Sequence, residues 1–173
     1  MRQQKDELPG GYTRLEYVQW KNKIIETNIA ANGSQWVLEL MRDANPRSTE
    51  IIIAASTRYG HHATANTTGK WGLGEGVETS IPVTTRSVIG INFSVKSITM
   101  SINSQNISRT GAEDLSTEKA QLFGFGRKYY YVGKIYSVKC VSGGSFNGVP
   151  AQRESDLKVG IYDTVSDIFY PTN

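Results

Sequence analysis

The sequence predicts an all-β protein, built as an antiparallel sandwich or barrel, and three observations support that prediction. Clusters of Gly, Asn, Ser, Thr and Pro recur at short intervals along the chain. The segments between these clusters are rich in Ile, Val, Tyr, Phe and Thr, which suit pleated, half-buried strands. Helical periodicity is weak, so many short strands joined by turns account for the pattern best.

The length and the cysteine content indicate one domain that needs no covalent support. The chain has 173 residues, a typical size for one domain, and a chain of that length buries about 70% of its unfolded surface. Its one cysteine is Cys140, so neither an internal disulfide nor a multi-cysteine zinc site is available.

The clearest strands lie in the middle of the chain. Residues 50–55 are nearly continuous in apolar side chains, as in a central strand covered on both faces. Residues 87–94 form a second strand, in which Gly90 is a candidate β-bulge. Residues 96–103 alternate between apolar and polar side chains and run into a turn, which predicts a hairpin with the segment from Ile107 onward.

A further strand is predicted over residues 132–141. The alternation places Tyr136, Val138 and Cys140 on one face of this strand. A catalytic cysteine needs a neighbouring base and electropositive surroundings. The pattern around Cys140 predicts a buried and inert thiol instead.

Two segments have a helical alternative. Residues 35–41 fit either a helical turn with Trp36 above Leu40, or a strand with Trp36, Leu38 and Leu40 pointing inward. Residues 112–119 are polar and have room for one short turn.

Charge and hydropathy argue against three classes of protein: those that bind nucleic acid, those that span a membrane and those that carry a signal peptide. The 19 basic and 16 acidic residues give a net charge of +3, and the densest basic patch is only the pair Arg127 and Lys128. Nucleic-acid-binding proteins gather basic residues on one face, so no nucleic acid is expected. The aliphatic run at 51–55 is far shorter than the roughly 20 residues of a membrane span. Residues 1–7 have no apolar stretch behind their charges, unlike a signal peptide.

The N-terminal part resembles a known family. Residues 8–19 read Leu-Pro-Gly-Gly-Tyr-Thr-Arg-Leu-Glu-Tyr-Val-Gln, and residues 24–29 read Ile-Ile-Glu-Thr-Asn-Ile. Both resemble the opening of a family of concanavalin A-like, laminin-G-like domains. This family occurs in bacteriophage tail and other virion proteins and in surface proteins of gut bacteria.

The C-terminal part resembles the same family in the same order. The matching segments are Gly-Lys-Ile-Tyr-Ser-Val-Lys at 133–139, Val-Pro-Ala-Gln-Arg at 149–153 and Val-Gly-Ile-Tyr-Asp-Thr-Val-Ser-Asp-Ile-Phe-Tyr at 159–170. The resemblance implies an antiparallel two-sheet jelly-roll sandwich of the lectin and glucanase type over residues 8–173, with residues 43–85 matching nothing in the family.

The acidic residues do not favour glycan cleavage. Glycosidases of this fold carry carboxylates two residues apart on one strand, so that an acid and a nucleophile flank the glycosidic bond. Glu75 and Glu78 are three residues apart in a Gly-rich stretch and are expected to be solvated surface acids. We therefore expect no catalytic residue and no enzymatic activity.

No metal site or cofactor is expected. His61 and His62 lie in an Asn- and Thr-rich stretch without further ligands, so a solvated loop pair is predicted. Related folds often hold a calcium ion at the rim through Asp and Asn oxygens. Asp163 and Asp167 are weak candidates for such an ion, and a structural turn explains them better.

The candidate binding residues are aromatic side chains with a neighbouring cation. Exposed aromatics and Arg are frequent at interface hot spots, although most aromatic residues belong to cores. Trp71 lies in a Gly-rich segment that could present it outward. Tyr129, Tyr130 and Tyr131 follow Arg127, and consecutive strand residues point to opposite faces, so at least one tyrosine is expected to be exposed.

These features predict a non-enzymatic binding module, and the resemblance implies that it belongs to a bacteriophage virion, attached to the tail fibre or the capsid. Its expected partners are other virion proteins, further copies of the chain, and a host-cell glycan or receptor. Two alternatives stay open. One is a purely structural decoration protein that stabilises neighbouring virion subunits, and the other is a glycan-cleaving enzyme.

The first residues form a separate arm in this prediction. Residues 1–7 are polar and are expected to fray in a free monomer. Arg2, Gln3, Gln4 and Lys5 are therefore candidate anchor residues for attachment to a partner.

Overall fold

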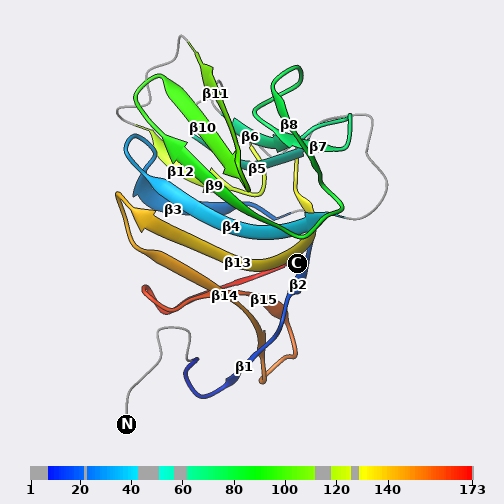
Figure 1. Cartoon of the computed structure of the whole chain (residues 1–173). Coiled ribbons are helices and arrows are strands. Elements are labelled where there is room, and N and C mark those ends of the chain that lie inside the picture. Colours follow the sequence, from blue (N-terminus) through cyan, green and yellow to red (C-terminus); the bar gives the residue numbers. More distant parts are fainter. Residues whose placement is uncertain are drawn as a thin grey trace.

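The computed structural model describes residues 8–21, 23–42, 51–56, 62–111, 118–125 and 129–172. Within these ranges the chain forms the strands β1 to β16 and no helix. The strands make two antiparallel sheets that pack as a sandwich (Figure 1). The all-β sandwich predicted from the sequence is confirmed. None of the described residues belongs to a helix that could cross a membrane.

The larger sheet has ten strands. Its main path runs in the order β11 (Gln105–Thr110), β10 (Ser97–Ile102), β9 (Ser87–Phe93), β4 (Gln35–Arg42), β13 (Val132–Ser142), β14 (Phe146–Arg153), β15 (Val159–Asp163) and β16 (Ile168–Pro171). The two N-terminal strands lie off this path, where β13 and β14 no longer pair with each other: β1 (Tyr12–Arg14) pairs with β14, and β2 (Val18–Lys21) pairs with β13.

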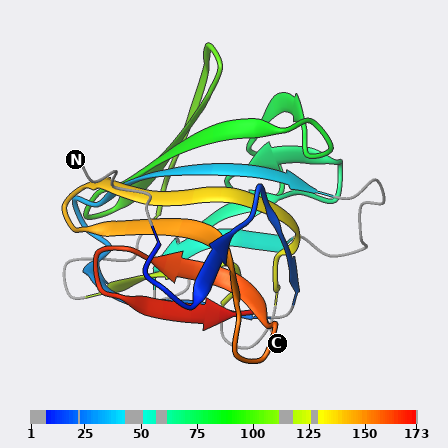
Figure 2. The same ribbon diagram turned by 90° about the horizontal axis from the view of Figure 1, so that it is seen from below.

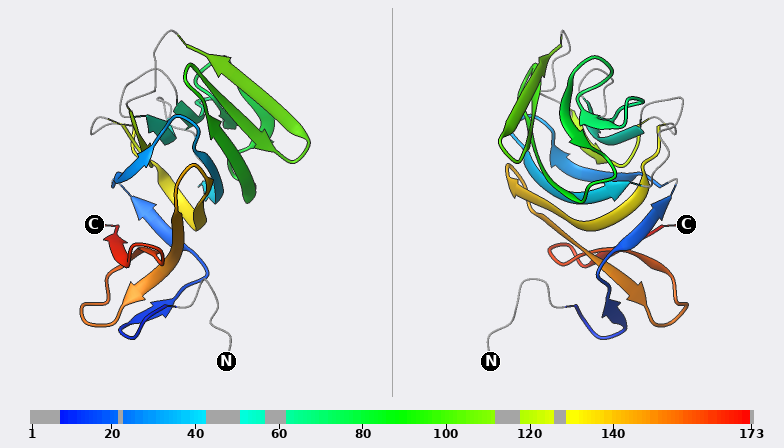
Figure 3. Two further views of the ribbon diagram at one scale, coloured as in Figure 1. Left: turned by 90° about the vertical axis from the view of Figure 1, so that its left-hand side faces the viewer. Right: turned by 45° about the vertical axis from the view of Figure 1, so that its right-hand side comes forward.

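The smaller sheet has six strands. Their order is β3 (Ile25–Ala30), β12 (Lys119–Leu122), β5 (Ile51–Ser56), β6 (His62–Ala65), β7 (Lys70–Gly72) and β8 (Glu78–Pro82). The right-hand view of Figure 3 shows β4 and β13 of the larger sheet curving around this smaller sheet.

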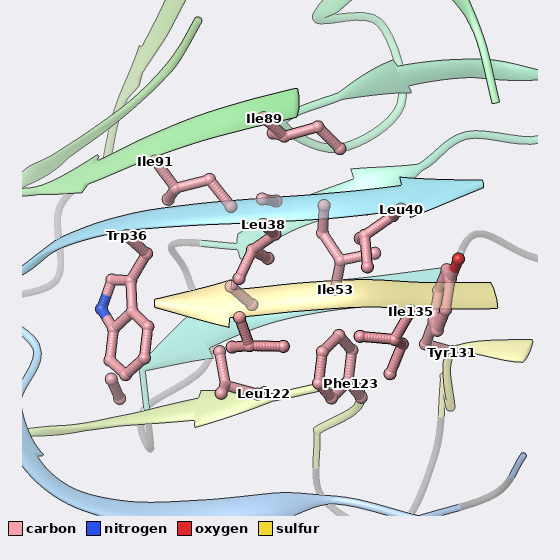
Figure 4. Packing of buried hydrophobic residues seen from close by; sticks show 14 of the residues in the cluster. Trp36, Leu38, Leu40, Ile53, Ile89, Ile91, Leu122, Phe123, Tyr131 and Ile135 are labelled. Carbon is pink, nitrogen blue, oxygen red and sulfur yellow. The ribbon is translucent and has the colours of Figure 1, made fainter. Parts of the chain in front are cut away.

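The hydrophobic core lies between the two sheets. Strand β4 contributes Trp36, Leu38 and Leu40, each at most 1% exposed. Figure 4 shows these side chains packed with Ile53 of β5 and Leu122 at the end of β12, which belong to the same core cluster. Residues 35–41 therefore form the predicted strand, and the helical alternative for this segment is wrong.

The other strand predictions are confirmed, with corrections at Gly90 and at Tyr136. Every residue of β5 is buried, and the strand pairs with β12 and β6, as expected of a covered central strand. Strands β10 and β11 form the predicted hairpin. The predicted bulge at Gly90 is wrong, because this residue pairs in unbroken register with Val37 and Ser101. The turn predicted at 112–119 falls largely outside the described residues.

Strand β13 departs from the predicted alternation. Its pairing with β4 shifts register between Ile135 and Ser137, so Tyr136 is an extra residue on the bulged strand. Val138 and Cys140 point into the core as predicted. The bulge turns Tyr136 to the outer face of the larger sheet, so the prediction that all three share one face is wrong for this tyrosine.

Candidate functional site

The structure places two of the predicted binding residues in the core. Trp71 is 0% exposed, because β7 pairs with β6 and β8 and directs this ring between the sheets. Tyr131 is also 0% exposed, and its hydroxyl lies 3.0 Å from the carbonyl oxygen of Lys134 and 3.1 Å from that of Met41. The expectation that Trp71 is presented outward is wrong, and neither ring is open to a ligand.

Of the remaining predicted residues, the structure describes only Tyr129 and Tyr130. Tyr129 and Tyr130 are half-buried and lie on the segment that leads into β13. Arg127 falls outside the described residues, as do the candidate anchor residues Arg2, Gln3, Gln4 and Lys5. Their roles stay predictions.

The two acidic residues weighed for catalysis, Glu75 and Glu78, both accept hydrogen bonds. Glu78 is half-buried and accepts hydrogen bonds from Thr68 at 2.5 Å and from the buried amide of Asn66 at 3.0 Å. These hydrogen bonds lower the pKa of Glu78. Glu75 is exposed as predicted, and its carboxylate accepts a hydrogen bond from the backbone N–H of Thr67 at 2.8 Å. The expectation of a solvated surface acid is therefore wrong for Glu78.

The residues considered for metal or thiol chemistry are mostly buried. His62, predicted in a solvated pair, begins β6 and is only 9% exposed, while His61 lies outside the described residues. Cys140 is a buried free thiol, as predicted, and burial raises its pKa. Across the described parts of the chain, no group of three or more His, Cys, Asp and Glu side chains could hold a metal ion.

Asp163 organises the turn between β15 and β16. Its carboxylate is 2% exposed and accepts hydrogen bonds from the N–H of Asn147 at 2.9 Å, the N–H of Val165 at 3.1 Å and the hydroxyl of Ser166 at 2.6 Å. Asp167 accepts a hydrogen bond from the hydroxyl of Tyr162 at 3.0 Å. These contacts match the structural turn that the spacing of the two aspartates favoured.

Replacing Asp163 with alanine should lower the free energy of unfolding by about 2–3 kcal/mol, because buried donors lose their acceptor. Asp163→Asn keeps one oxygen for the two backbone N–H groups and should lose less than half as much. Urea unfolding of both variants measures the difference. Equal losses in the two variants would show that charge, and not the acceptor geometry, holds this turn.

A pocket of about 410 Å³ opens on the outer face of the larger sheet. Its lining is mainly polar and charged. Strands β1, β4, β13 and β14 contribute to it, together with the β1–β2 connection and Arg86, the residue that precedes β9. The lining residues are Arg14, Leu15, Glu16, Glu39, Arg86, Tyr136, Ser137, Lys139, Gly148 and Val149.

The pocket arises where β13 and β14 separate. Strand β13 pairs with β2 up to Ile135 and with β14 from Val138 onward, so the bulged Tyr136 falls in the gap. Strand β14 pairs with β13 as far as Gly148 and with β1 from Ala151 onward. The β1–β2 connection therefore crosses the fork between the two strands. In Figure 2 the dark-blue β1 and β2 can be followed past β14.

Two tyrosine rings, flanked by two cations, stack beside the pocket. The guanidinium of Arg86 lies over the ring of Tyr136, 3.7 Å from its centroid. The ring of Tyr136 is 5.7 Å from that of Tyr17, and the ammonium of Lys134 lies 4.7 Å from the centroid of the Tyr17 ring. Cation–π and tilted ring contacts of this kind fix side-chain orientation. Tyr17 stays 39% exposed, whereas Tyr136 is 9% exposed.

Two carboxylates hold Arg86 in place. Its Nε donates a hydrogen bond to Glu39, and one terminal nitrogen lies 3.6 Å from Glu16. The hydrogen bond to Glu39 raises the pKa of Arg86. The Arg86 side chain is 46% exposed, so water screens these pairs and their main effect is on orientation. Arg14 and Lys139 add two further positive charges to the lining.

Sequence reasoning missed the residues of this pocket as a site. The alternation of β4 could have placed Glu39 on the outer face, beside the inward Leu38 and Leu40. No local pattern reports that β13 and β14 diverge, or that a connection from residues 15–17 crosses the gap between them.

No protein-family model matches the sequence, and no curated protein matches it either. The fold and the pocket therefore define the class. The chain is an all-β protein of two antiparallel sheets, with a charged pocket on the outer face of the larger sheet.

Proposed function

We propose that this protein is a non-enzymatic binding module that recognises a cell-surface glycan through the pocket at the β13–β14 fork. The observation that supports this is the pocket itself, whose volume of about 410 Å³ lies within the roughly 300–1,000 Å³ of small-molecule sites. Its Arg, Lys and Glu side chains can donate to and accept from sugar hydroxyls. The exposed ring of Tyr17 lies next to them.

The orientation of the pocket residues suits binding. Arg86 is fixed by Glu39 on one side and by the ring of Tyr136 on the other. A side chain that is already ordered loses little conformational entropy when a ligand binds. The pocket therefore offers directed hydrogen-bonding groups on a rigid sheet.

We also propose that this module is part of a bacteriophage virion, because its N- and C-terminal segments resemble a concanavalin A-like, laminin-G-like family that occurs in phage proteins. In that setting residues 1–7 would attach the domain to the tail fibre or the capsid. Deletion of residues 1–7 should then abolish incorporation into particles without loss of glycan binding. Incorporation of the truncated chain at the normal level would contradict the anchor.

Binding is tested with a glycan array and with intact bacterial cells, using the purified protein and its Arg86→Ala variant. We expect the variant to bind at least about tenfold more weakly, since it loses the oriented cation and leaves Glu16 and Glu39 without their partner. Lys96→Ala, at an exposed turn on the same sheet, is the matched control and should bind normally. Absence of binding to any glycan or cell would refute the lectin function and favour the structural decoration protein.

The same array separates binding from cleavage. Glu16 and Glu39 both line the pocket and both approach Arg86, an arrangement that deserves comparison with a glycosidase pair. Each carboxylate faces the guanidinium as an acceptor, which does not suit a proton donor. Release of reducing sugar ends from bound glycans, lost in Glu39→Gln, would overturn the non-enzymatic assignment.

A further inference from the structure

The balance of charge in the pocket indicates the kind of ligand. Arg14, Arg86 and Lys139 contribute positive charge, and Glu16 and Glu39 contribute negative charge. Both carboxylates face the same cation, Arg86. Over the ranges that the structure describes, neither carboxylate pairs with Lys139, so this ammonium carries the positive charge that the ligand meets.

Lys139 has no counter-charge among the residues that the structure describes. Within the described part of the chain, its side chain makes no hydrogen bond or ion pair, although it is half-buried. Its partners in the sheet register are Val37 on β4 and Asn147 on β14, neither of which carries a charge. Glu39 lies two residues beyond Val37 on β4, and its carboxylate accepts a hydrogen bond from Arg86. Partial burial makes the charge of an ammonium group costly when it has no acceptor, so an anion that binds beside Lys139 is stabilised by this ammonium.

The contacts of Arg86 leave one edge of its guanidinium weakly held. The Nε edge is hydrogen-bonded to Glu39, and the plane lies over Tyr136, so both constraints stay in place when a ligand enters. The terminal nitrogen is 3.6 Å from Glu16, whose side chain is 75% exposed. An exposed pair of this length contributes little, so a better-placed anion can replace Glu16.

We infer that the pocket binds an acidic sugar, whose carboxylate or phosphate takes the place of Glu16 on Arg86 and is also bound by Lys139. The planar fork of an arginine suits both groups, and a lysine ammonium adds a point charge. This inference rests on the proposed glycan binding and names the class of glycan.

The test uses matched pairs of immobilised glycans: sialylated and desialylated oligosaccharides, a uronate and its parent hexose oligosaccharide, and a phosphorylated sugar and its parent. The acidic member of at least one pair should bind at least about tenfold more tightly and lose affinity as salt rises. The separate carboxylate and phosphate arms tell the two sources of charge apart. Equal binding of acidic and neutral members would overturn the inference and leave glycan binding intact. Binding of neither member of any pair would overturn both.

Two substitutions with opposite effects exclude a merely structural explanation. Lys139→Gln should weaken binding of the acidic glycan about tenfold, and Lys139→Arg should restore most of it. Glu16→Gln should strengthen binding of the same glycan about threefold, because it removes the competing carboxylate. Lys96→Gln is the control and should change nothing. A Glu16→Gln variant that binds more weakly, or a Lys139→Gln variant that binds normally, would contradict the inferred contacts.

Discussion

Trp20→Ala should lower the free energy of unfolding by about 3–5 kcal/mol, the range for removal of a large buried aromatic side chain. Trp20 lies on β2 and is 0% exposed. Its ring is 5.5 Å from that of Phe123, which follows β12 and is 5.6 Å from the ring of Tyr131. The substitution therefore opens a cavity where β2 of the larger sheet meets the smaller sheet.

Urea unfolding followed by far-UV circular dichroism measures the loss, and Trp20→Phe serves as the control. Phenylalanine keeps most of the buried surface and removes the indole N–H that donates to the carbonyl oxygen of Lys23 at 2.8 Å. That variant should lose about 1–2 kcal/mol, because it gives up one part-buried hydrogen bond and part of the buried ring surface. A Trp20→Ala variant within about 1 kcal/mol of the parent would mean that β2 is not part of the cooperative core.

Short-range patterns in the sequence predict most of the fold. Alternation predicted the apolar row of β10, because a strand with one face in the core has a two-residue period in its sequence. For β4 the same period gave one of two alternatives, since the spacing of Trp36 and Leu40 also fitted a helical turn. The continuous apolar run of β5 predicted its burial on both faces. In β13 the alternation failed at Tyr136, because a bulge adds one residue to the strand. Side chains before and after that extra residue therefore no longer follow one two-residue period.

The candidate site was much less predictable. Trp71 was expected outside because glycines surround it, yet Gly69 and Gly74, both at positive φ, make the turns that let β7 pair on both sides and bury the ring. The pocket at the β13–β14 fork depends on pairings between segments more than 100 residues apart, such as Val18 with Ile135. A single sequence contains no local signal for such a pairing, so neither the pocket nor the approach of Glu16 to Arg86 could be derived from it.

Gly143→Ala should lower the free energy of unfolding by about 2–5 kcal/mol. Two separate causes contribute to this loss. Gly143 lies in the turn between β13 and β14 at φ +82°, a conformation that costs an L-residue roughly 1–2 kcal/mol. A Cβ atom there would also lie 2.6 Å from the carbonyl oxygen of Gly33 and 2.8 Å from the Cα of Ser34. Both are backbone atoms, so no side-chain rotation relieves the overlap, which adds about 1–3 kcal/mol.

Gly33→Ala is the matched control for the first cause alone. Gly33 has the same φ of +82°, and a Cβ atom there would have no heavy atom within 4 Å. Its alanine variant should therefore lose only the roughly 1–2 kcal/mol of the backbone conformation. Urea unfolding of both variants gives the difference, which measures the close approach of the β3–β4 and β13–β14 turns. Equal losses would show that the two turns move apart at no cost, and that their contact does not hold β13 and β14 on the course that forms the pocket.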